Sequence, residues 1–309
     1  MAWNLGIIGD SYLDEYQAED DRGGAYHAIS FSPIEVIARA RSAYFNVGAW
    51  GTRAAPRRTG YEYCWARSGA TAGDLFTQSP GTSIVSQGQH TGLAAQVTAG
   101  AVDTVVIWIG INDFHILHDT YRDVYDGTVE GANLTAKINS IVSNLTTTLD
   151  TLIAAGATRI LVSDFQDFGP GATALYPIAA FRQRVTNAIN LVNSSLYALI
   201  AARPTVALMP AHDWFFTTLP AEYPIVGGSI TVGGEQIDTT VNADEPHHFA
   251  LADSHIGTVG NGIVVNQLFR DPLLAEFGLS MPRLTDIEIL AQAGLAETAP
   301  IGTPVLSVR

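Results

Sequence analysis

The sequence is short of lysine, cysteine and long apolar runs. Its only lysine is Lys137, and its net charge is −14. Binding to nucleic acid requires clustered basic side chains, so we expect no nucleic-acid partner. A single cysteine, Cys64, excludes an intrachain disulfide and a multi-cysteine zinc site, and its apolar surroundings predict a buried packing residue. No apolar run approaches the ~18 residues that would predict a membrane span.

Apolar material is plentiful and predicts one globular core. Hydrophobic residues make up 47% of the 309 residues, and charged residues make up only 15%. Met1 is followed almost directly by an apolar strand, without the pattern of a signal peptide. We therefore expect a cytoplasmic protein, or a secreted one whose signal has been removed. The sequence does not predict an oligomeric state.

Strand-like and helix-like segments alternate along the chain. The strand-like runs are short and rich in β-branched residues, whereas the segments between them repeat apolar residues at helical spacing. This alternation predicts an α/β fold with a central parallel sheet covered on both faces. The predicted strands are Leu5–Ile8, Thr104–Ile109, Arg159–Ser163 and Thr205–Met209, and the two long helices fall within Gly127–Ala155 and Pro177–Ala202.

Two stretches interrupt this alternation. Residues 18–60 mix a short helix with a loop, and residues 224–250 contain a predicted hairpin across Gly233-Gly234. Insertions of this kind often shape a binding rim, so we expect both to form walls of a substrate pocket. A short helix is predicted over Leu284–Ala293, and the tail after it has no pattern that indicates a role.

Two polar motifs follow predicted strands. Gly9-Asp10-Ser11 comes directly after the first strand, and Gly110-Ile111-Asn112-Asp113 follows the second. Ligands of an open α/β sheet bind at the carboxyl ends of its strands, so Ser11 and Asn112 are expected in one crevice. Glycine permits a sharp turn before the serine, and an amide N–H from Asn112 can stabilise an oxyanion.

Two more motifs complete the set. Ser68-Gly69-Ala70-Thr71 is a glycine-containing turn, and Asp253-Ser254-His255 precedes an apolar helix-like segment. A serine hydroxyl is a poor nucleophile without a base, which a histidine supplies. A carboxylate can then orient that histidine and stabilise its charged form.

Together these four motifs resemble the sequence blocks of the SGNH, or GDSL, hydrolases, in the same order and over most of the chain. The resemblance implies a flavodoxin-like three-layer α/β/α sandwich and hydrolysis of carboxylic esters without a cofactor. It implies Ser11 as nucleophile, His255 as base and Asp253 as its orienting acid, with an oxyanion hole from the backbone N–H groups of Ser11 and Gly69 and the side chain of Asn112. The hydrolase domain would then span 1–275, followed by a C-terminal helix and tail at 276–309.

The last motif departs from the family pattern. The family usually places two residues between the late Asp and His, whereas here only Ser254 separates them. Asp244 and His247 do have the usual spacing and are kept as the lesser candidates. His255 is preferred because it runs into an apolar helix-like segment, which His247 does not.

Other functions receive less support from the sequence. No serine satisfies the Gly-x-Ser-x-Gly pattern of the other large esterase class, and no phosphate-binding loop is present. His115 and His118 could share a helical face as a metal pair, although the sequence offers no third ligand. The alternatives to an esterase are a catalytically silent carbohydrate- or ligand-binding module on the same fold and, after it, a metal-dependent hydrolase. Acetylated sugars, short-chain esters and lipids all stay open as substrates.

Overall fold

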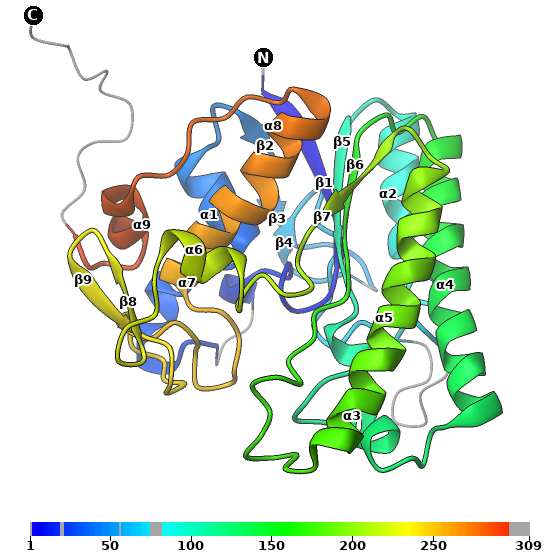
Figure 1. Ribbon diagram of the computed structural model, residues 1–309. Helices are drawn as coiled ribbons and strands as arrows, with labels where there is room; N and C mark the ends of the chain where they lie inside the picture. The colour runs from blue at the N-terminus through cyan, green and yellow to red at the C-terminus, as the bar shows by residue number, and fades with distance from the viewer. Residues whose placement is uncertain (1, 19–21, 56, 75–81, 297–309) are drawn as a thin grey trace, which may run out of the picture.

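The central sheet has five parallel strands in the order β2-β1-β5-β6-β7 (Figure 1). The computed structural model describes residues 2–18, 22–55, 57–74 and 82–296. All four predicted strands are confirmed. The fifth, β2, is only two residues long and was not predicted. The strands are β1 (Trp3–Gly9), β2 (Phe45–Asn46), β5 (Thr104–Trp108), β6 (Ile160–Ser163) and β7 (Val206–Met209).

Both faces of the sheet are buried, which explains why its strands are continuous apolar runs. Successive side chains of a strand point to opposite faces, so each strand contributes to two separate cores. Ile7, Val106 and Leu161 belong to one apolar cluster, and Ile8, Ile107 and Val162 to the other.

Helices cover each face and form the outer layers of an α/β/α sandwich (Figure 1). The predicted three-layer fold is confirmed. No helix in the described part of the chain is long and apolar enough to cross a membrane. One face carries α2 (Gln89–Thr98), α3 (Asp119–Tyr125), α4 (Gly131–Ala154) and α5 (Ala179–Ala201), and the other carries α1 (Pro33–Ala40), α7 (Thr258–Val264), the π-helical η4 (Val265–Arg270) and α8 (Asp271–Phe277).

The chain also contains shorter helices and strands outside the central sheet and the helices that cover it. The predicted hairpin is confirmed as β8–β9, and Gly233 and Gly234 make its turn with φ of 56° and 99°. The short C-terminal helix is confirmed as α9, and residues 297–309 lie outside the described residues. The remaining elements are η1 (Tyr16–Ala18), η2 (Gly24–Ile29), β3 (Trp50–Gly51), β4 (Gly60–Tyr61), η3 (Ile111–Asp113), α6 (Thr218–Glu222), β8 (Ser229–Val232), β9 (Glu235–Asp238) and α9 (Asp286–Gln292).

The strand order determines where a ligand site can form. Numbered along the chain, the five parallel strands follow the order 2-1-3-4-5 of flavodoxin-like folds. The direction of winding reverses between β1 and β5, and the loops that leave their carboxyl ends diverge there. Ser11 follows β1 and Asn112 follows β5, so both motifs lie at this switch point, at the end of the sheet where Figure 1 draws α3.

Candidate active site

The turn that carries Ser11 is fixed by hydrogen bonds on both sides. A Cβ at Gly9 would collide with the carbonyl oxygen of Trp108, so only glycine allows β1 to approach β5 this closely. Gln89 clamps Gly9 by accepting its N–H at 3.0 Å and donating to its carbonyl oxygen at 3.1 Å. Within the turn, the Asp10 carboxylate accepts the N–H of Tyr12 at 3.0 Å. Ser11 is 6% exposed, so it is shielded from most water but can still be reached by a substrate.

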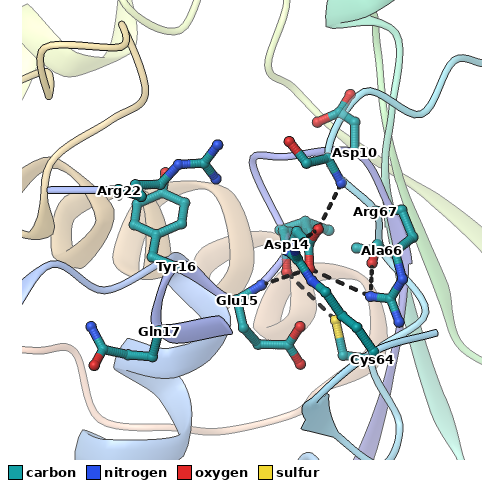
Figure 2. A network of polar contacts seen from close by, with 12 residues as sticks. Asp10, Asp14, Glu15, Tyr16, Gln17, Arg22, Cys64, Ala66 and Arg67 are labelled. Carbon is teal, nitrogen blue, oxygen red and sulfur yellow. Dashed lines mark hydrogen bonds and ion pairs between the residues drawn. The ribbon is translucent and has the colours of Figure 1, made fainter. Parts of the chain in front are cut away.

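Asp10 is a fully buried carboxyl beneath this turn. Burial raises its pKa to about 8, the charge of Asp113 adds to the shift, and the hydrogen bond from Tyr12 opposes it. Its Oδ2 atom has no hydrogen-bond partner among the described residues, so no donor there stabilises the ionised form. Figure 2 shows the Asp10 carboxyl pointing away from Asp14, which pairs with Arg67 and Arg58.

We expect the free energy of unfolding to fall as the pH rises from 6.5 to 8. In that range Asp10 holds its proton in the folded chain but has lost it in the unfolded chain, where the pKa of its carboxyl is near 3.8. A raised carboxyl pKa therefore lowers stability by up to about 1.4 kcal/mol per pH unit in this window, and no further above pH 8. Urea denaturation of wild type and Asp10→Asn at both pH values should give a smaller loss in the variant, and equal losses would refute the assignment.

The turn that carries Gly69 leaves a backbone donor free. Gly69 has a φ of 78°, and no atom lies within 4 Å of the position that its Cβ would take. A left-handed turn that faces open space thus follows Ser68. Among the hydrogen bonds of the described residues, none engages the N–H of Gly69 or that of Ser11. Both groups are therefore available to a bound oxyanion.

The η3 turn fastens the Gly69 turn to the end of β5. Asn112 donates one amide N–H to the carbonyl oxygen of Ala70 at 2.8 Å, so the second N–H of the same amide can donate to another acceptor. The Asp113 carboxylate accepts the N–H groups of Ala72 and Gly73 at 2.8 and 2.9 Å. Lys137 is buried on α4, and its Nζ donates to the carbonyl oxygen of Asp113 at 2.6 Å. Two chain segments that supply predicted oxyanion donors are thus joined by side-chain hydrogen bonds.

Asp253 and His255 make direct contact despite their short spacing. The Nδ1 of His255 lies 2.9 Å from Asp253 Oδ2, at ion-pair distance, although its N–H does not point along the line of a hydrogen bond. Ser254 is the one non-glycine residue with positive φ, at 71°, in the described chain. This left-handed residue turns the backbone so that Asp253 Oδ1 also accepts the N–H of His255 at 3.1 Å. A single intervening residue is therefore enough to bring the pair together.

Arg22 is a third member of this group that the sequence did not reveal. Its Nε lies 3.0 Å from the same Asp253 oxygen, and its guanidinium stacks on the ring of Tyr16 at 4.9 Å, a pairing visible in Figure 2. Partial burial alone would raise the pKa of Asp253, but His255 and Arg22 outweigh it and hold that pKa well below its usual value. Asp253 is therefore ionised throughout the neutral range, as an acid that orients a histidine must be.

The ring of His255 packs against the segment that contains Ser11. The rings of Tyr12 and Tyr16 each lie 6.0 Å from the imidazole, both in edge-on geometry. Tyr16 is held in turn by a hydrogen bond from its hydroxyl to the carbonyl oxygen of Ile256 at 3.2 Å. No hydrogen bond joins Ser11 to His255 within the described residues, and the contacts between their segments run through the rings of Tyr12 and Tyr16.

The lesser candidates lie in a different setting. His247 is half exposed and lies 3.4 Å from Glu235 of the hairpin. Asp244 accepts the N–H of Ala252 at 3.0 Å, so it supports the loop before Asp253. Neither makes a ring or hydrogen-bond contact with the Ser11 turn among the described contacts.

The expectation of a helical face for His115 and His118 is wrong. Residues 114–118 form a turn, and α3 begins only at Asp119, because His118 has extended backbone geometry before that helix. The two rings are still in contact, with centroids 4.3 Å apart and an angle of 35° between their planes. The described residues contain no group of three or more His, Cys, Asp or Glu side chains placed to hold a metal ion.

Cys64 is a buried residue, and the first inserted stretch lines a cavity of its own. Cys64 is buried, as predicted, and burial raises the pKa of its thiol. The stretch at 18–60 lines a separate cavity of about 390 Å³, to which it contributes Glu35 and Trp50, beside Tyr61. Within this stretch Arg22 contacts Asp253, so the stretch borders the candidate site at that residue.

These features define the chain as a parallel α/β protein with a serine, a histidine–carboxylate pair and free backbone donors at the switch point of its sheet. No family model and no curated protein matches the sequence. Among solved structures, the chain is similar to Axe2, an acetylxylan esterase from Geobacillus stearothermophilus, with 14% identity and a TM-score of 0.40 over 91% of this chain and 95% of that chain. A TM-score this low does not establish a shared function.

Proposed function

We propose that this chain is a serine hydrolase of the SGNH type that cleaves carboxylic esters through an acyl-enzyme on Ser11. The observation that carries the proposal is the packing of His255 against Tyr12, the next residue after Ser11, and against Tyr16 at the start of η1. It supports the assignment of His255, which is paired with a carboxylate, as the base for the serine that follows β1. The hydrolase domain spans 1–275 in this proposal, and 276–309 continue it as a helix and tail.

In the first half of the reaction, His255 takes the proton of Ser11 Oγ as that oxygen bonds to the ester carbonyl carbon. Its Nδ1 faces Asp253, so the opposite ring nitrogen, Nε2, receives the proton. The carbonyl oxygen becomes an oxyanion, for which the N–H groups of Ser11 and Gly69 and the Asn112 amide are the donors. When the intermediate collapses, the bond to the leaving alcohol breaks and that alcohol takes the proton from His255.

The second half regenerates the enzyme. Water attacks the acyl carbon while His255 accepts one of its protons, and the same donors hold the second oxyanion. The bond to Ser11 Oγ then breaks, the serine recovers its proton, and the carboxylic acid leaves. Each step uses side chains and backbone groups of this chain alone.

Hydrolysis of p-nitrophenyl acetate by the purified protein tests this function. We expect turnover at a rate proportional to enzyme concentration, with release of acetate and p-nitrophenol in equal amounts. Binding of esters without any turnover would favour the alternative of a silent ligand-binding module. Loss of turnover after exhaustive chelation, restored by a divalent metal, would favour a metal-dependent hydrolase.

Asp253→Asn should lower kcat/KM by roughly 10²- to 10⁴-fold, because a neutral amide no longer stabilises the charged imidazole. The matched control is Asp244→Asn, whose side chain can still accept the N–H of Ala252 and should leave kcat/KM within about twofold. Steady-state kinetics on the same ester separate the two. A larger loss in the Asp244 variant would transfer the orienting role to that carboxylate.

A further inference from the structure

A cavity of about 450 Å³ opens beside the proposed catalytic residues. Four parts of the chain form its walls: Tyr12 in the turn after β1, residues 111–117 after β5, residues 168–175 after β6, and a segment that contributes Thr240, Asn242 and Ser254. Its volume falls within the roughly 300–1,000 Å³ of small-molecule sites. Residues 224–250 thus contribute to its wall as expected, whereas none of the lining residues comes from 18–60.

The proposed nucleophile, the proposed base and one proposed oxyanion donor each have a chain neighbour in this wall. Tyr12 adjoins Ser11, Ser254 adjoins His255, and Ile111 adjoins Asn112, and all three line the cavity. The cavity therefore lies where a substituent of a bound ester would extend from the reacting carbon.

The walls of this cavity are mainly apolar. Ile116 and Leu117 face it from the loop after β5, and Phe168 and Leu175 face it from the loop after β6. Leu117 and Leu175 are 51% and 57% exposed, so their apolar surface is available to a ligand without any rearrangement of the core. Polar side chains in the wall are those of Tyr12, of His115 and of the segment with Thr240, Asn242 and Ser254.

No lining residue carries a full charge at neutral pH. The one titratable imidazole in the wall is His115, and its Nδ1 accepts the N–H of Leu117 at 3.1 Å. Burial and the nearby His118 and His255 lower the pKa of His115 to about 4, so the ring stays neutral. Neither an anionic nor a cationic substituent would find a partner here.

We propose that this cavity binds an uncharged aliphatic group of medium length, about six to ten carbons, carried by the ester. The inference rests on the proposed function and deepens it, because it selects aliphatic esters over acetylated sugars as the preferred substrates. The group belongs either to the acyl chain or to the alcohol of the ester. Both offer the same chemistry to the cavity.

Two ester series distinguish these sources. One varies the acyl chain of p-nitrophenyl esters from acetate to decanoate, and the other varies the alkyl alcohol of acetate esters from methyl to decyl. We expect kcat/KM to rise in at least one series, by up to about fourfold for each methylene group that becomes buried. A flat or falling profile in both series would overturn the inference, while Ser11-dependent acetate hydrolysis would leave the proposed function standing.

Leu175→Asp tests whether this cavity is responsible. The variant should lower the ratio of octanoate to acetate hydrolysis by about tenfold, because a carboxylate in the wall must be desolvated when the chain binds. Leu191→Asp is the matched control, since Leu191 is equally exposed at 56% but lies on α5 outside the cavity. The inference fails if both variants change the ratio equally.

A binding measurement does not depend on turnover. Octanamide, titrated calorimetrically into Ser11→Ala protein, should bind at least about tenfold more tightly than acetamide. Addition of Leu175→Asp to that background should remove most of the difference. Equal affinity for acetamide, octanamide and N-octylacetamide, which carries the chain on the side of the alcohol, would overturn the inference even if the protein hydrolysed no ester at all.

Discussion

Replacement of Ser11 by alanine is expected to lower kcat/KM for p-nitrophenyl acetate by about 10⁴-fold or more. The variant lacks the oxygen that forms the acyl-enzyme, and only the oxyanion donors and substrate binding would be left to assist attack by water. The backbone of the turn should persist, because its hydrogen bonds use Gly9, Asp10 and Gln89 rather than the serine hydroxyl.

The Ser11→Ala result needs a test of folding beside it. Circular dichroism and the urea midpoint should match wild type within the small changes typical of an isolated substitution. Ser195→Ala is the matched control, since its hydroxyl bonds only to the carbonyl oxygen of Leu191 on the exposed side of α5. Wild-type activity in a properly folded Ser11→Ala protein would remove Ser11 from the reaction.

His255→Ala is expected to have an effect of similar size, about 10⁴-fold in kcat/KM. Without the imidazole, nothing in the site takes the proton of Ser11, and the ring that packs between Tyr12 and Tyr16 is lost. Asp253 would keep its ion pair with Arg22, so the variant does not leave the Asp253 carboxylate without a partner of opposite charge.

The matched control for His255 is His247→Ala. His247 has the family's usual spacing from an aspartate, but it contacts Glu235 on the hairpin and is half exposed. Its removal should leave kcat/KM within about twofold of wild type. If the two histidine variants exchanged their effects, the base would be His247, and the packing around His255 would have only a structural role.

The sequence predicted the layers of the fold well because the strands are buried on both faces. Continuous apolar runs such as β5 and β6 are typical of strands that are buried on both faces. In the helix between them, the buried apolar residues recur at the helical spacing of about 3.6 residues. The short β2 was missed because two residues, one of them exposed, carry no periodic signal. The hairpin β8–β9 was found because two adjacent glycines permit the positive φ angles of its turn.

The sequence indicated the residues of the candidate site, but it did not indicate the backbone geometry and the contacts that connect some of them. Nothing in the sequence indicates that Ser254 adopts a φ of 71°, yet this residue lets Asp253 reach His255 across a single position. Arg22 comes from a loop without a motif, and only the folded chain brings it to the Asp253 carboxylate. A similar limit applies to His115, which was expected on a helix but lies in a turn that lines the cavity beside the site.

Labelling with a fluorophosphonate tests the central claim most directly, because this reagent reacts covalently only with a serine that an adjacent base activates. After proteolysis and mass spectrometry, we expect a single phosphonylated peptide, with the adduct on Ser11, and little or no labelling in His255→Ala protein. Absence of any adduct from active, folded protein, or an adduct on another serine, would contradict the assignment of Ser11 as the nucleophile.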